Sequence, residues 1–163
     1  IEEEQMHSRI IELGNAPILP DDRMGECSVP EWFYHSIADY TNAETDRDED
    51  LKWFLEIVAH IVDVAEDGES FTFKPNAKKK YFHRQYYAFL DKARELTGIS
   101  IEAFCAETAY DIGMAMYKLN EAYQDKFSFY IYYQDKLKTL DEWIRETDLS
   151  ESFYFGGTLD YHF

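Results

Sequence analysis

The sequence predicts an α+β domain of five to six helices packed around a central helix at about residues 100–124, beside a small antiparallel sheet of three to four strands that includes a C-terminal β-hairpin. Three observations lead to this prediction. The central segment is apolar around most of a helical surface, residues 125–134 alternate with a period of two, and the tail 152–163 places Gly-Gly between two apolar runs. At 163 residues the chain is long enough for one core, so we expect a single domain, 1–163.

The predicted central helix carries an apolar stripe that includes Ile112, Met116 and Leu119 when residues are spaced by 100°. The polar band of this helix, which carries Glu107, Asp111, Lys118 and Glu121, is narrow. A helix with so little polar surface is usually covered on several sides, so we expect residues 100–124 to be buried.

The segment after it alternates aromatic side chains on both faces, with Phe129 and Ile131 on one and Tyr130 and Tyr132 on the other. We therefore expect a middle strand, or a strand whose tyrosine face is a binding surface. In the tail, a three-residue loop at Gly156–Thr158 would place the large side chains together. Those side chains are Phe153, Phe155, Leu159, Tyr161 and Phe163.

The remaining elements follow from apolar periodicity and from start and stop residues. A short strand is expected at 70–74, between Gly68 and Pro75. The other helices are expected at residues 2–14, 30–41, 48–66, 76–96 and 135–147.

Composition restricts the classes of function. The net charge of −17 makes direct binding to nucleic acid improbable, because phosphates would be repelled. No apolar run approaches the roughly 18 residues of a membrane span, and the acidic N-terminal residues do not resemble a secretory leader. Cys27 and Cys105 are interpreted as thiols in a reducing compartment, which favours a cytoplasmic protein. No cofactor is expected.

Acidic residues are concentrated between Asp21 and Asp67, where fourteen carboxylates meet three basic residues. Carboxylates three or four apart on a helix stand about 5 to 6 Å from one another, a spacing comparable with that of backbone phosphates. The sequence therefore favours a non-enzymatic protein whose negative face binds a basic partner; a nucleic-acid-mimicking inhibitor or immunity-type protein, acting on a nuclease or DNA-binding protein, is one form. The residues assigned to this acidic face are Asp21, Asp22, Glu31, Asp39, Glu44, Asp46, Asp48, Glu49, Asp50, Glu56 and Asp63.

The predicted helix 76–96 offers an alternative site, because residues 74–94 hold seven basic residues and one acid, Asp91. Tyrosine beside arginine can bind a phosphate or a base, so this helix could belong to a small enzyme or a nucleotide-binding domain. The favoured interpretation is that this helix docks on the molecule's own acidic surface or on a symmetry mate. The residues of this alternative site are Lys78, Lys79, Lys80, His83, Arg84 and Tyr87.

Two histidines suggest a further alternative, a metal site. His35 and His60 each lie four residues after a glutamate on a predicted helix, and bundles bind metals with such groups. Both sets face away from the apolar stripes, so a solvated surface is the favoured interpretation and no metal is expected. The sequence lacks a Walker loop, GxGxxG, GxSxG and CxxC, so we assign no catalytic residue.

Overall fold

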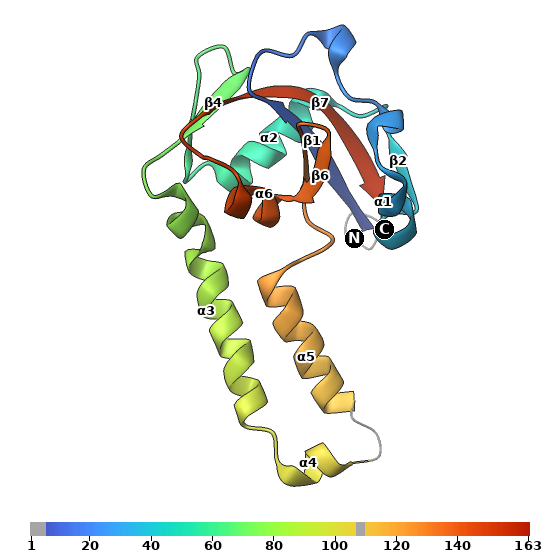
Figure 1. Ribbon diagram of the computed structural model, residues 1–163, viewed down its shortest axis with the longest axis vertical. Helices are drawn as coiled ribbons and strands as arrows, with labels where there is room; N and C mark the ends of the chain where they lie inside the picture. The colour runs from blue at the N-terminus through green and yellow to red at the C-terminus, as the bar shows by residue number, and fades with distance from the viewer. Residues whose placement is uncertain (1–5, 107–109) are drawn as a thin grey trace. The chain divides into compact units, whose positions relative to one another are not determined.

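The computed structural model describes residues 6–106 and 110–163 (Figure 1). The chain forms two compact units. The first, Ile1–Lys78 with Phe127–Phe163, contains the sheet and is called the sheet unit below. The second, Lys79–Lys126, is called the helical unit.

Within its described residues, the sheet unit is built on seven strands in a mixed sheet, so the expected small antiparallel sheet of three to four strands is wrong. The order is β3-β4-β7-β1-β5-β6, β2 also pairs with β7, and β1 runs parallel to β5. The strands are β1 (His7–Gly14), β2 (Tyr40–Asn42), β3 (Val62–Val64), β4 (Ser70–Phe73), β5 (Tyr130–Tyr133), β6 (Lys136–Thr139) and β7 (Ser152–His162).

The first element is a strand rather than the helix expected at 2–14, of which residues 2–5 lie outside the described residues. β1 lies between β7 and β5. Ile10, Ile11 and Leu13 are buried, and apolar side chains on both faces are typical of a strand that is covered on both faces. Its partner strands, β5 and β7, are more than a hundred residues away in sequence. Pairing with them stabilises a strand more than the weak local helical pattern stabilises a helix.

The tail is one continuous strand, so the expected β-hairpin is also wrong. β7 pairs Thr158 with Ile11 but Phe155 with Leu13, which leaves one extra residue on β7 and makes a β-bulge. The bulge reverses the alternation, so Phe155 and Leu159 point to opposite faces of the sheet. The five large side chains of the tail therefore do not share one face.

Two charged side chains hold the bulge in place. The Glu12 carboxylate accepts hydrogen bonds from the backbone N–H groups of Met24 (2.9 Å) and Gly157 (2.8 Å). Arg47 Nε donates to the carbonyl oxygen of Gly156 at 2.8 Å. A Cβ at position 156 would lie 2.1 Å from Glu12 Oε1, so this close approach requires glycine.

Helix α1 (Glu31–Ser36) covers one face of the sheet. Its Phe33 packs edge-on against Tyr130 and Tyr161, with ring centroids 4.9 and 5.1 Å away. Two short 3-10 helices, Pro20–Asp22 and Glu26–Ser28, precede α1. The expected helix 30–41 ends at Ser36, and its last residues belong to β2.

The opposite face is covered by α2 (Arg47–Val58) and α6 (Leu140–Glu146). Phe54 of α2 contacts Phe129 and Phe155, and Trp143 of α6 contacts Phe153. The expected helices 48–66 and 135–147 were each too long, because their ends form β3 and β6. β5 is a middle strand between β1 and β6, as predicted.

The helical unit holds most of α3 (Ala77–Thr97), together with α4 (Ile101–Cys105) and α5 (Tyr110–Tyr123). Gln85 of α3 donates to the carbonyl oxygen of Tyr123 at 2.7 Å. α3 agrees with the expected helix 76–96, but the expected central helix is wrong: α4 and α5 are separate, and none of their described residues is buried.

Across the described part of the chain, every helix is too short or too polar to span a bilayer.

Candidate functional site

The start of α2 carries a dense group of charges, Glu44–Asp50, called the acidic segment below. Asp46 caps the helix by accepting a hydrogen bond from the backbone N–H of Glu49 at 3.2 Å. Acidic residues in the first turn are stabilised by the helix dipole, which favours this sequence at a helix start. Two charged residues of the segment, Arg47 and Asp50, turn toward the sheet. The other four, Glu44, Asp46, Asp48 and Glu49, are exposed.

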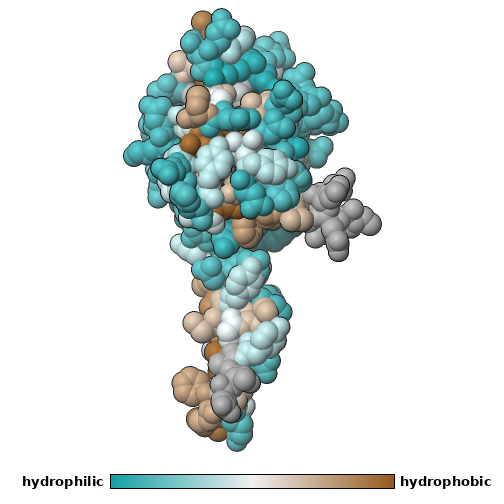
Figure 2. Space-filling model, turned by 90° about the vertical axis from the view of Figure 1, so that its right-hand side faces the viewer, coloured by the Kyte–Doolittle hydropathy of each residue, from teal (hydrophilic) through white to brown (hydrophobic). Residues whose placement is uncertain are grey.

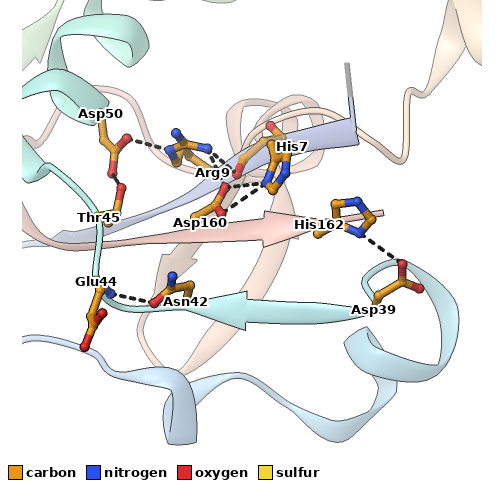
Figure 3. A network of polar contacts seen from close by, with 10 residues as sticks. His7, Arg9, Asp39, Asn42, Glu44, Thr45, Asp50, Asp160 and His162 are labelled. Carbon is orange, nitrogen blue, oxygen red and sulfur yellow. Dashed lines mark hydrogen bonds and ion pairs between the residues drawn. The ribbon is translucent and has the colours of Figure 1, made fainter. Parts of the chain in front are cut away.

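Asp50 fixes the segment to the strands (Figure 3). The residue is only 3% exposed, and its side chain accepts three hydrogen bonds. Arg9 Nε of β1 donates to Oδ1 at 2.5 Å, while the hydroxyls of Thr45 and Thr158 donate to Oδ2 at 2.7 and 2.8 Å. A buried carboxylate is tolerated when its oxygens are satisfied in this way.

Arg9 extends this network along the sheet. Its Nη1 donates to Asp160 Oδ1 of β7 at 2.5 Å, and the guanidinium lies 5.4 Å from the ring centroid of Trp53. His7 Nδ1 lies 3.1 Å from Asp160 Oδ2. One arginine thus links carboxylates from α2 and β7, as Figure 3 shows.

A second histidine–aspartate pair lies next to the first. His162 Nδ1 is 3.0 Å from Asp39 Oδ2, and Tyr40 stacks on the His162 ring with centroids 5.1 Å apart. The His7 and His162 rings are in edge contact at 4.9 Å. The network therefore joins β1, β2 and β7 at one end of the sheet.

Arg47 provides the other attachment of the acidic segment. Besides its bond to Gly156, its Nη2 donates to the carbonyl oxygen of Phe155 at 3.3 Å and to Glu69 Oε2 at 3.1 Å. Two inward-facing side chains therefore hold the backbone from which four carboxylates project. A surface fixed in advance loses little conformational entropy on binding.

The carboxylates assigned to the acidic face are distributed widely. Ten of the eleven are exposed, and Asp50 is buried. Glu31 lies on α1 and Glu56 on α2, which cover opposite faces, so the acidic residues surround the sheet rather than form one surface. The acidic segment is their most compact subset.

The charge is divided unevenly between the two units. Residues 79–126 contain seven basic and seven acidic residues, whereas the rest of the chain contains nine and twenty-six. The sheet unit therefore carries the entire net charge of −17.

The alternative metal site is not assembled. His35 is on α1, where Nε2 lies 3.4 Å from Glu31 Oε1, and His60 follows α2 on the opposite side of the sheet. Among the residues that the structure describes, no three His, Cys, Asp or Glu side chains converge to hold a metal ion.

The basic residues of α3 are spread along its exposed surface. All six assigned residues, from Lys78 to Tyr87, are exposed. His83 and Tyr87 form an edge contact, with centroids 5.1 Å apart. Lys78 Nζ donates to the carbonyl oxygen of Arg145 at 2.8 Å, beside a cavity of about 530 Å³ that Lys74 and Asp148 also line.

A second cavity, of about 300 Å³, lies beside β6 and α6 and is lined by Lys138, Trp143, Glu146 and Asp148. The Lys138 ammonium, which bonds to Glu146, lowers the pKa of that carboxyl group. Hydrogen bonds from Ser150 lower the pKa of Asp148.

Tyr132 of β5 lies outside this cavity. Burial is the largest cause that raises the pKa of its hydroxyl group, and the neighbouring Asp135 carboxylate is the next.

Four members of the network, His7, Arg9, Asp160 and His162, were missed in the sequence. The two ends of the chain are more than 150 residues apart, and only the antiparallel pairing of β1 with β7 brings them together. The polar residues His7 and Arg9 alternate as on a strand, which was the available signal.

Comparisons of this chain with protein-family models, curated proteins and solved structures found no match.

Proposed function

We propose that this protein is a non-enzymatic binding protein whose acidic segment, Glu44–Asp50, engages a basic protein partner. One observation carries the proposal: Arg47 and Asp50 fix the segment to β1 and β7, while four carboxylates project into solvent. These two inward-facing attachments hold the backbone of the acidic segment in place beside the sheet.

The net charge of the sheet unit supports the same partner chemistry. A field from −17 charges accelerates the approach of a basic protein and disfavours acidic ones. Closely spaced carboxylates resemble a phosphate array, so a nucleic-acid-binding enzyme is the class of partner that this surface fits best.

The test compares two variants of equal charge. In the segment variant, Asp46→Asn, Asp48→Asn and Glu49→Gln remove three projecting carboxylates and retain the side-chain oxygen that caps α2. In the control, Glu66→Gln, Asp135→Asn and Glu151→Gln remove three exposed carboxylates elsewhere on the sheet unit. Immobilised wild-type protein first captures basic proteins from lysate at low salt, and dissociation constants are then measured for each captured protein.

We expect the segment variant to bind at least about tenfold more weakly than wild type, and the control to stay within about threefold. Affinity should also fall steeply with added salt. An equal loss of affinity in both variants would show that binding depends only on the total charge. Unchanged affinity in the segment variant would refute the proposal.

A further inference from the structure

The helical unit leaves much of its apolar surface uncovered. None of its described residues is buried. Figure 2 shows hydrophobic side chains, in brown, over its surface. Eight large apolar side chains among its described residues are 49–72% exposed: Tyr86, Tyr87, Ile101, Phe104, Tyr110, Met116, Tyr117 and Tyr123.

The uncovered area, summed over the whole helical unit, is comparable with one side of a stable interface. A large side chain buries about 150–250 Å² when fully covered, so the eight together leave roughly 900 Å² available. A standard protein–protein interface buries about 800 Å² on each partner.

Helix α5 presents the uncovered surface as a second stripe. Ile112, Leu119 and Ala122 are half-buried on one side. Beside them, Gly113, Met116, Asn120 and Tyr123 are exposed, at intervals of three, four and three residues. This spacing places the four on one stripe of the helix, where Met116 and Tyr123 are the large apolar side chains.

The charges of the helical unit are self-complementary. Its base half, residues 79–90 and 116–126, contains five basic and two acidic residues, for a charge of +3. Its tip half, residues 91–115, contains two basic and five acidic residues, for a charge of −3. Two copies in antiparallel orientation place each +3 half against a −3 half, whereas a parallel pair opposes like charges.

We propose that the occupant of this surface is a second copy of this chain, which joins two helical units into an antiparallel bundle with two-fold symmetry. A two-fold interface uses the same patch on both chains, and the opposite charges of the two halves satisfy that requirement.

The test measures the molar mass of the full chain by sedimentation equilibrium between about 1 and 100 μM, a range that suits micromolar dissociation constants. We expect wild type to reach twice 19.3 kDa. A base variant, Lys79→Glu with Lys80→Glu, changes the base half to −1. A tip variant, Glu95→Lys with Glu102→Lys, changes the tip half to +1. All four substituted residues are exposed.

Each reversal alone should weaken the dimer by at least about tenfold, and both reversals in one chain should restore it, because opposite charges face each other again. Met116→Gln should weaken the dimer more than Lys118→Gln, which lies on the polar band of the same helix. Circular dichroism confirms that every variant keeps its helix content. A wild-type chain that stays monomeric would refute self-association and leave another protein as the occupant, and a single reversal that strengthens the dimer would refute the antiparallel arrangement.

Discussion

Asp50 and Asp48 are two residues apart on α2 and have opposite environments. Asp50 is buried and accepts hydrogen bonds from Arg9, Thr45 and Thr158, whereas Asp48 is exposed. Breaking a buried ion pair leaves a charge without its partner and usually costs about 3–5 kcal/mol. Arg9 retains its bond to Asp160, so the lower end of that range applies here.

We predict that Asp50→Asn lowers the free energy of unfolding by about 3 kcal/mol. The matched substitution Asp48→Asn, on the exposed side of the same helix turn, should change it by less than about 0.5 kcal/mol. Urea denaturation followed by tryptophan fluorescence measures both values. Equal losses would mean that the Arg9 network does not stabilise the fold.

Among the elements, the β5–β6 turn and the start of α6 are both set by local residues. Gln134 and Asp135 both have positive φ, 51° and 61°, which makes a two-residue hairpin turn. Thr139 then caps α6 by accepting a hydrogen bond from the backbone N–H of Glu142 at 3.2 Å. The segment expected to form one helix is therefore a strand followed by a short helix.

The ion pair between Lys138 of β6 and Glu146 of α6 predicts a dependence of stability on pH. Because Lys138 lowers the pKa of Glu146 below its ordinary value of 4.5, the pair stabilises the folded protein above that pH. The contribution disappears as the pH falls through the lower, folded-state pKa. The difference in unfolding free energy between wild type and Glu146→Gln should therefore be present at neutral pH and vanish in acid.

Urea denaturation at a series of pH values measures this difference. The control repeats Glu146→Gln in a Lys138→Met background, where the substitution should have little effect at any pH. A difference that persists without Lys138 would assign the effect to another interaction of Glu146.

At the scale of the whole molecule, the two units differ in how much of their backbone is protected. β7 pairs with β1, β2 and β4 in the buried centre of the sheet, whereas the helical unit has no buried residue among those described. The free energy required to unfold a segment locally is largest where the segment is most buried.

We predict that backbone amides of β1 and β7 exchange hydrogen most slowly and those of α4 and α5 most rapidly, as measured by mass spectrometry. If two chains associate through the helical unit, its exchange should slow as protein concentration rises, while exchange in the sheet unit stays constant. Uniform protection of both units at low concentration would contradict the structural difference described here.

The sequence by itself determined the features that depend on neighbouring residues. The apolar period of Leu51, Phe54 and Val58 predicted the body of α2, and the alternation of residues 129–132 predicted a middle strand. It also predicted the position of α3, from the residues that begin and end it. The clustering of acids near Asp46 pointed to the segment on which the proposed function rests.

Only the tertiary structure decided which apolar residues are covered. Ile10 and Ile11 lie in a central strand because β5 and β7 pair with it, and the bulge near Gly156 depends on Glu12 and Arg47. Met116 is exposed although its pattern is that of a core helix. The physical reason is the same for the central strand, the bulge and Met116. Strand pairing and burial depend on residues that are distant in the chain, whereas sequence periodicity indicates only which side chains are hydrophobic.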